Sequence, residues 1–235
     1  MIVQIQTAPL YPVYQPLVWL TSGKLAGHEA LLRSTGDEFP EYLFRDARAM
    51  GHLNELDVWA LKQAVTTYFE ESSGRSRDSL LFVNVFPSTL LNAAFADFLE
   101  TVCQRNLHPI GRIVLEINEA SEEEKMWDIA MLGRKIRELR EHGFLIALDD
   151  VGSGAASLRK IVEYEPDIVK LDRFFGQGLA ANASKQKLIS LFIDYCAGQS
   201  LLVLEGLEKS EDVAAARMLG VPIGQGFLIG RPARL

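Results

Sequence analysis

The feature that most constrains the fold is the alternation of short apolar segments with segments of helical periodicity along the whole chain. The apolar segments are rich in Val, Ile, Leu and Phe, as strands buried on both faces are. We expect strands at Tyr14–Leu20, Leu25–Leu32, Leu80–Val85, Arg112–Ile117, Phe144–Leu148, Ile168–Leu171, Leu201–Leu204 and Ile223–Ile229. We expect helices at Glu55–Glu71, Asn92–Asn106, Glu122–His142, Ala181–Ala197 and Glu211–Leu219, the last with Ser210 as its N-cap. Helices between strands supply the crossovers that a parallel sheet needs.

The number of expected strands favours a closed barrel. About eight strands in 235 residues match the size of a (β/α)₈ barrel, and a doubly wound open sheet is the competing architecture. Only Thr21–Lys24 separates the first two strands, which is too short for a crossover helix, so that pair should be antiparallel. We therefore expect an α/β fold, a modified TIM barrel with one antiparallel strand near the N-terminus, with residues 1–235 forming a single domain.

Charge and composition exclude several classes of partner. The net charge is −7 and no Lys/Arg run stands out, so a nucleic acid polymer is disfavoured, whereas a small phosphorylated ligand stays compatible. No apolar run approaches the roughly 20 residues of a membrane segment, and the N-terminus lacks the basic residues of a secretory signal. Cys103 and Cys196 are expected to be buried thiols of a cytoplasmic protein.

Polar side chains follow the apolar interiors of most expected strands. In a parallel barrel the carboxyl ends of the strands lie on one rim, where active sites sit. The oxygen ligands expected to converge there are Glu29, Asn84, Glu116, Asp149, Asp150 and Glu205. Carboxylates that face one another repel unless they take up protons or divalent cations occupy the centre. Oxygen ligands without a Cys/His cluster indicate Mg²⁺ or Mn²⁺, and this number of carboxylates favours two ions.

Such a pair of ions suits phosphodiester hydrolysis, because the ions hold the phosphate and lower the pKa of a bound water. Lys170 follows Ile168–Val169 and is a candidate for orienting water or phosphate. Any single acidic residue at a strand end is more often a helix cap or a solvated charge, and Glu119 and Glu208 stay open between loop anchor and site residue. Gly152-Ser153-Gly154 is a weak dinucleotide motif and fits better as a loop beside the carboxylates.

The motifs around these residues resemble those of EAL-domain cyclic di-GMP phosphodiesterases. They occur in the order YQPLV (Tyr14–Val18), GHEALLR (Gly27–Arg33), VNVFP (Val83–Pro87), LEINE (Leu115–Glu119), LDDVGSG (Leu148–Gly154), VKLD (Val169–Asp172), EGLE (Glu205–Glu208) and GQGFLIGRP (Gly224–Pro232). The resemblance implies a modified TIM barrel and the metal-dependent hydrolysis of cyclic di-GMP to linear pGpG.

The resemblance also implies roles for individual residues. The metal ligands would be Glu29, Asn84, Glu116, Asp149, Asp150 and Glu205. The catalytic set would be Glu29, Lys170, Glu205 and Glu208, with Lys170 positioning or activating the hydrolytic water. The nucleotide would be bound through Gln15, Leu32, Arg33 and Gln225, and Glu119 would anchor the loop after Asp150.

The chain departs from the family pattern at four positions that remove no metal ligand. Val151 replaces an aromatic residue, Phe86 a small Ser, Leu204 an Ala and Leu207 a Val. The change at Val151 motivates an alternative function, a catalytically weak or silent cyclic di-GMP receptor that acts through a partner protein. A third possible function is that of a different metallohydrolase with the same barrel fold. A homodimer, a sensory partner and the question of a full protein or an excised domain stay open.

Overall fold

The computed structural model describes residues 9–36, 40–71, 79–104, 110–118, 121–127, 130–152 and 157–235. Its strands close into one barrel in sequence order, which excludes the doubly wound open sheet. They are β1 (Leu10–Trp19), β2 (Leu25–Ser34), β3 (Leu80–Val85), β4 (Ile113–Ile117), β5 (Leu145–Val151), β6 (Ile168–Leu171), β7 (Leu201–Leu204) and β8 (Ile223–Gln225). Strand β1 pairs antiparallel with both β2 and β8, and the other pairs are parallel, as the short first connection predicted.

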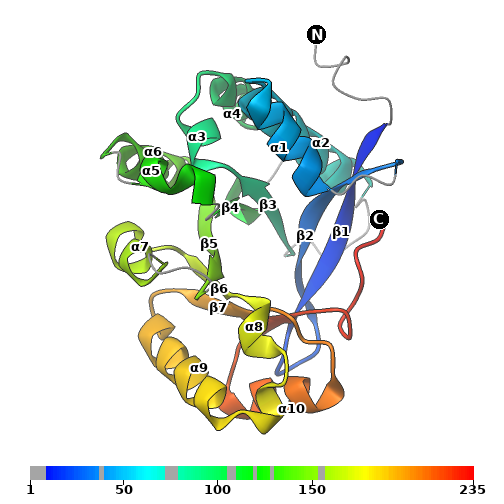
Figure 1. Ribbon diagram of the computed structural model, residues 1–235, viewed down its shortest axis with the longest axis vertical. Helices are drawn as coiled ribbons and strands as arrows, with labels where there is room; N and C mark the ends of the chain where they lie inside the picture. The colour runs from blue at the N-terminus through cyan, green and yellow to red at the C-terminus, as the bar shows by residue number, and fades with distance from the viewer. Residues whose placement is uncertain are drawn as a thin grey trace.

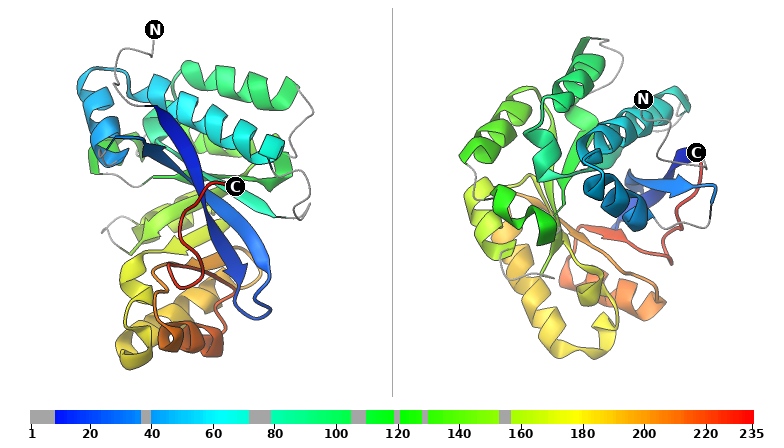
Figure 2. Two further views of the ribbon diagram at one scale, coloured as in Figure 1. Left: turned by 90° about the vertical axis from the view of Figure 1, so that its right-hand side faces the viewer. Right: turned by 45° about the horizontal axis from the view of Figure 1, so that its top comes forward.

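Helices surround the barrel, and the right-hand view of Figure 2 shows the strands at the centre of this ring. The longer described helices are α1 (Pro40–Ala49), α2 (Leu53–Glu71), α4 (Ala94–Gln104), α6 (Ala130–Glu141), α7 (Ser157–Tyr164), α9 (Ala183–Cys196) and α10 (Ser210–Leu219). The short ones are α3 (Pro87–Leu90), α5 (Glu124–Trp127) and α8 (Arg173–Gly176), with 3₁₀ turns η2 (Ile110–Arg112), η3 (Ser121–Glu123) and η4 (Leu179–Ala181). Figure 1 shows α3 and α8 in front of the sheet, after β3 and β6. Across the described ranges, no helix combines the length and apolarity needed to cross a membrane.

Three expectations about local structure were wrong. Strand β8 ends at Gln225 instead of Ile229, because the chain turns there and Ile229 N donates to Gly226 O. The segment expected to begin a helix at Glu122 starts instead with the 3₁₀ turn η3, followed by α5, and α6 covers Ala130–Glu141, with residues 128–129 outside the described ranges. Ser210 is the first residue of α10 and Lys209 is its N-cap, without a side-chain hydrogen bond.

The barrel interior is filled by an apolar layer to which every strand contributes one side chain. The layer consists of Leu17, Ala26, Phe82, Val114, Ala147, Ile168, Val203 and Ile223. Side chains that are two residues apart in a strand point to the same face. The next inward positions toward the carboxyl ends are therefore Asn84, Glu116, Asp149, Lys170, Glu205 and Gln225, together with Gln15 on the antiparallel β1. A layer of polar side chains thus lies directly on top of the apolar layer.

Glu29 joins this polar layer because of an irregularity in β2. The β1–β2 register shifts between Leu17, which pairs with Gly27, and Val18, which pairs with Leu25. As a result of this shift Gln15 lies opposite Glu29. The neighbouring His28 faces the other way, and its Nδ1 lies 3.1 Å from the Tyr68 hydroxyl on α2. A β-bulge of this kind changes which side chains point inward.

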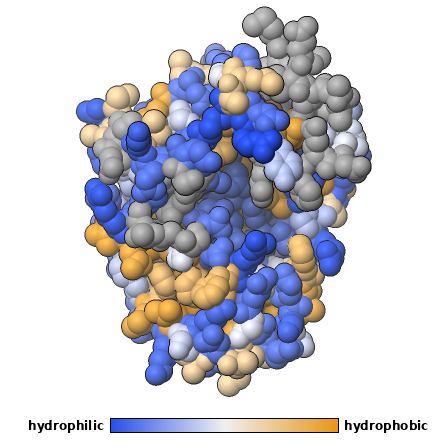
Figure 3. Space-filling model, viewed as in Figure 1, coloured by the Kyte–Doolittle hydropathy of each residue, from blue (hydrophilic) through white to orange (hydrophobic). Residues whose placement is uncertain are grey.

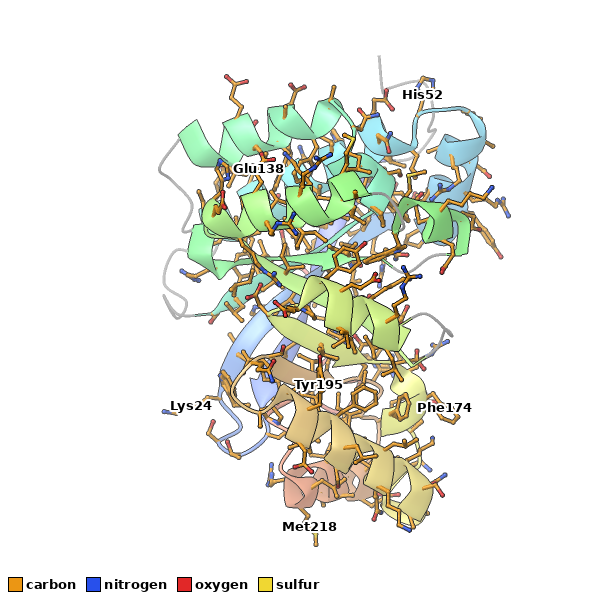
Figure 4. All side chains as sticks on the ribbon, turned by 90° about the vertical axis from the view of Figure 1, so that its left-hand side faces the viewer. Lys24, His52, Glu138, Phe174, Tyr195 and Met218 are labelled. Carbon is orange, nitrogen blue, oxygen red and sulfur yellow. The ribbon has the colours of Figure 1, made fainter. Side chains whose placement is uncertain are left out.

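The two rims of the barrel are separated in Figure 4. Lys24, in the turn before β2, and Phe174, after β6, lie on opposite sides of that view. The polar layer belongs to the rim of Phe174, at the carboxyl ends of the parallel strands.

Candidate functional site

Lys170 of β6 is the centre of the polar layer and is almost completely buried. Its Nζ lies 2.7 Å from Glu116 Oε1, 2.7 Å from Glu205 Oε1, 3.0 Å from Asp149 Oδ1 and 3.5 Å from Glu29 Oε2. These carboxylates come from β2, β4, β5 and the residue directly after β7, so residues far apart in sequence meet around one ammonium group.

The charges in this cluster do not balance. One ammonium beside four carboxylates leaves three negative charges uncompensated when all the acids are ionised. Burial raises the pKa of Glu116 well above its usual value, and burial raises the pKa of Glu205 to about 8. Burial by itself lowers the pKa of Lys170, but the carboxylates, Asp149 first, outweigh it and raise that pKa. The site therefore needs protons or further positive charge.

Side-chain amides hold Glu29 in place. Gln225 Nε2 donates to Glu29 Oε2 at 2.6 Å, and Asn84 Nδ2 donates to Glu29 Oε1 at 3.3 Å. Gln225 Nε2 also lies 3.2 Å from Gln15 Oε1, and Gln15 Nε2 donates to the Gly230 carbonyl at 3.0 Å. Neutral donors from β3 and β8 thus orient Glu29 without adding charge, and Gln15 of β1 holds Gln225.

A second irregularity brings Asp150 to the same rim. Adjacent strand residues normally point to opposite faces, but the β5–β6 register shifts between Leu148 and Val151 and Asp150 has φ +52°. Asp tolerates this left-handed conformation better than most residues. Oxygen atoms of Asp149, Asp150 and Glu205 then lie within 4.8 Å of one another. Burial, followed by the charge of Asp149, raises the pKa of Asp150 to about 7.

The donor set fits divalent cations. Glu116 Oε2 is buried and has no hydrogen-bond partner within the described part of the chain, and the Gln225 Oε1 atom is in the same situation. An unsatisfied buried acceptor costs about 1–3 kcal/mol, more when it is charged. A cation that accepts oxygen ligands would satisfy the carboxylates and remove their repulsion, and hard cations such as Mg²⁺ or Mn²⁺ prefer these ligands.

A cavity of about 850 Å³ adjoins the cluster, and Asn84 belongs to both. It lies between the ends of β2 and β3 and helix α1, and its lining includes Leu32, Arg33, Arg45 and Arg48. Arg33 Nη1 donates to the Leu32 carbonyl at 2.7 Å. Figure 3 shows hydrophilic residues gathered in the hollow at the middle of this face. The volume and the cations suit a small phosphorylated ligand.

Two expected site residues are not placed in this cluster. Glu208 is exposed, and its Oε1 lies 3.4 Å from Gln177 Nε2. Glu119 lies outside the described residues, as do Ser153 and Gly154 of the loop after Asp150.

Sequence reasoning missed Asp57, a buried acid of α2 that lines the cavity. Its Oδ2 accepts from Phe86 N at 2.9 Å, and burial raises its pKa to about 7. The sequence did contain a signal, because Asp57 sits between Leu56 and Val58 in a helix that is mostly apolar. A carboxylate at such a position needs a partner or a function.

Known sequences include relatives that match nearly the whole of this chain. The chain is 32% identical over 238 residues to an uncharacterized protein, Rv1354c, of Mycobacterium tuberculosis, covering 97% of this chain and 37% of that protein. It is 29% identical over 236 residues to the "Probable cyclic di-GMP phosphodiesterase PdeI" of Escherichia coli, covering 97% of this chain and 29% of PdeI. The chain thus spans about a third of the length of these curated relatives.

Solved structures share the fold. PaMucR phosphodiesterase, in a c-di-GMP complex, has a TM-score of 0.83 at 25% identity, covering 96% of this chain and 92% of that one. BlrP1 of Klebsiella pneumoniae, in a manganese/cy-diGMP complex, has a TM-score of 0.83 at 24% identity, covering 96% of this chain and 56% of that one. The sequence profile named "EAL domain" matches residues 3–232. With that match over nearly its whole length, and with the barrel and the relatives above, this chain belongs to the EAL domain family.

Proposed function

We propose that this chain hydrolyses cyclic di-GMP to linear pGpG in a metal-dependent reaction. The observation that supports this most is the ring of carboxylates around Lys170, with its unsatisfied Glu116 oxygen, directly beside the cavity. Among the relatives, PdeF is named a cyclic di-GMP phosphodiesterase and PdeI a "Probable cyclic di-GMP phosphodiesterase", and the PaMucR structure is a c-di-GMP complex. Family membership, donor chemistry and a neighbouring cavity therefore support the same function.

The proposed metal ligands are the oxygen donors of the polar layer. They are Glu29, Asn84, Glu116, Asp149, Asp150 and Glu205. Two Mg²⁺ or Mn²⁺ ions would supply Lewis-acid stabilisation of the developing charge and a more acidic water. Asn84 donates its amide to Glu29, which leaves its carbonyl oxygen as the ligand atom. The amides of Gln225 and Asn84 fix the orientation of Glu29, which reduces the reorganisation that metal binding requires.

Lys170 acts in this proposal as a permanent ammonium. A general base would have to give up its proton near neutral pH, and the raised pKa of Lys170 opposes that. Its three donor hydrogens can hold the carboxylates at a fixed spacing and orient a water or a phosphate oxygen. We therefore assign Lys170 a positioning and electrostatic role, and loss of this residue should reduce turnover.

The nucleotide would occupy the cavity beside the ring. Arg33 and Leu32 line the cavity, and Gln15 and Gln225 belong to the polar layer and contact each other there. Guanidinium groups suit phosphate oxygens because they present a planar set of donors. We keep Glu119 as the anchor of the loop after Asp150 and Glu208 as a supporting residue at the end of β7, both as proposals.

The proposal extends to assembly and location. Apolar side chains are exposed on α7, α8 and α9, namely Leu158, Val162, Phe174 and Leu191, and Figure 4 shows Phe174 pointing away from the ribbon. Exposed apolar side chains suit self-association, so we propose a homodimer contact that uses them. Sedimentation at several concentrations tests this.

Cys196 is a buried free thiol, which suits a cytoplasmic location.

The experiment that tests the function is product analysis after metal removal. Protein stripped with EDTA is incubated with cyclic di-GMP, and Mn²⁺ or Mg²⁺ is then added while chromatography follows pGpG. We expect product only with metal, and no product from Glu29→Ala. Exposed Glu70 of α2 provides the matched control, and Glu70→Ala should turn over like the wild type. Binding of cyclic di-GMP without product would support the silent receptor instead. Faster cleavage of linear diesters would support a different metallohydrolase.

A further inference from the structure

Two phenylalanine rings form one wall of the cavity. Phe44 of α1 and Phe86, just before α3, both line it. Their ring centroids are 5.5 Å apart with an interplanar angle of 63°, an edge-to-face contact. Both rings are only half-buried. We call this pair the aromatic wall. Phe86 is a feature of this chain, because the motif that VNVFP resembles has a small Ser at that position.

The position of Phe86 is fixed by its backbone. Phe86 N donates to Asp57 Oδ2 at 2.9 Å, and Pro87 begins α3 directly afterwards. Asp57 is buried, so this anchor is protected from water. Phe86 lies two residues after Asn84, whose side-chain amide donates to Glu29 in the carboxylate cluster. The aromatic wall is therefore held close to the carboxylate cluster.

Arg48 is held against the same wall. Its guanidinium carbon lies 5.4 Å from the centroid of the Phe86 ring. Its Nη1 pairs with Glu123 Oε1 at 2.5 Å, and Glu123 Oε2 accepts from Ser88 N at 2.8 Å. Glu123 is almost completely buried, so this pair is well shielded and ordered. The guanidinium group of Arg48 thus lies over one face of the Phe86 ring in a cation–π contact, and its charge is balanced by Glu123.

We propose that the aromatic wall stacks a purine base of the bound nucleotide. A ring face is the natural partner of a base, and every base has a π-face that can stack. Arg33 and Arg45 also line the cavity and suit the phosphates of the same ligand, whereas Arg48 is already paired with Glu123. This inference rests on the proposed function for the position of the phosphodiester, which lies at the carboxylate cluster. Phe86 would then determine how tightly the substrate binds, whereas the carboxylates determine cleavage.

The test separates ring chemistry from apolar volume. Phe86→Leu keeps an apolar side chain without a ring, and Phe86→Tyr keeps the ring. Loss of a stacked base weakens binding by about 5- to 150-fold. We therefore expect Phe86→Leu to raise the KM for cyclic di-GMP, and the Kd for cyclic di-GMP and GMP, by a factor in this range. Its kcat should change little, and Phe86→Tyr should stay close to the wild type. Thermal unfolding confirms that each variant is folded.

A matched control removes a ring elsewhere. Phe69 has the same kind of partner, with the Arg112 guanidinium carbon 5.5 Å from its ring centroid, and it is not part of the cavity lining. Phe69→Leu should leave KM and Kd unchanged. A spectroscopic readout is independent of turnover: the indole introduced by Phe86→Trp should lose fluorescence on adding GMP, compared with the wild type. Ribose 5-phosphate, which has no base, should not cause this loss.

The outcomes distinguish this inference from the proposed function. If the wild type cleaves cyclic di-GMP and Phe86→Leu has unchanged KM and Kd, the aromatic wall does not stack the base, and the function stands. If no cyclic di-GMP is cleaved but Phe86→Leu still weakens nucleotide binding, the function is wrong and the inference stands. If the wild type binds neither cyclic di-GMP nor GMP, both are wrong.

Discussion

Replacing Glu205 with glutamine should stabilise the metal-free protein, although Glu205 is a proposed metal ligand. Burial raises the pKa of Glu205 from 4.5 to about 8. Between these values the folded protein keeps a proton that the unfolded chain releases, so the free energy of unfolding falls as pH rises. This penalty is absent below the unfolded pKa and complete above the folded one. Glutamine cannot ionise and therefore avoids it, while its carbonyl oxygen can still accept from Lys170.

The size of the gain follows from the two pKa values. Each pH unit between them corresponds to about 1.4 kcal/mol, so the variant should be more stable by about 3 kcal/mol at pH 7 but only about 1 kcal/mol at pH 5. For a chain of this length the gain at pH 7 corresponds to a rise in Tm of about 6–12 °C. Urea unfolding in EDTA at both pH values measures the difference directly.

Bound metal should make the wild type more stable than Glu205→Gln. A cation that binds only the folded state stabilises it by mass action, and the wild type offers one more carboxylate to that cation than the variant does. Glu70→Gln, a change at an exposed position on α2, should shift the free energy of unfolding by less than about 0.5 kcal/mol. The reasoning is refuted if Glu205→Gln is less stable than the wild type in EDTA at pH 7, or if its gain is the same at pH 5.

Four further predictions concern the same cluster. Glu29→Ala should retain the fold by circular dichroism but lose turnover, and full turnover would remove its metal role. Lys170→Ala leaves buried carboxylates without their cation, so turnover should disappear and metal-free stability at pH 7 should fall by about 3–5 kcal/mol in urea unfolding; unchanged kcat would contradict the role of Lys170. Gly176→Ala places a Cβ 1.9 Å from the Glu205 carbonyl oxygen, so it should destabilise by about 1–3 kcal/mol, whereas Gly111→Ala has room and should not. Mn²⁺ affinity by calorimetry should rise from pH 6 to pH 8 with proton release, because the pKa of Glu205 is about 8; affinity independent of pH would argue against binding at these carboxylates.

The barrel and its polar layer could be predicted because both depend on simple periodicities. Apolar runs of strand length separated by helical segments indicate a parallel barrel. Glu116, Asp149 and Glu205 each follow an apolar strand interior, and the parallel arrangement brings such positions to one rim. In the structure the oxygens of these three residues lie around Lys170 Nζ.

Other parts of the site depend on contacts between segments with no shared sequence signal. Helix α1 was not expected, and its Arg48 meets Glu123 only because η3 folds back beside it. The roles of Asp57 and Phe86 depend on a hydrogen bond from the Phe86 backbone N–H to the Asp57 carboxylate, which joins the chain after β3 to α2. The end of β8 is set by the turn at Gly226, where an added Cβ would lie 2.2 Å from the Leu207 carbonyl oxygen. Such close approaches follow from tertiary packing.

The most direct test of the central claim is the number of divalent ions that the carboxylate ring binds. Free Mn²⁺ can be followed by electron paramagnetic resonance as the metal is titrated into EDTA-stripped, desalted protein at pH 8. The wild type should bind two Mn²⁺ per chain, and Asp149→Asn should lose at least one of them with its fold intact. A wild type that binds no more Mn²⁺ than this variant would contradict the assignment of these oxygens as metal ligands.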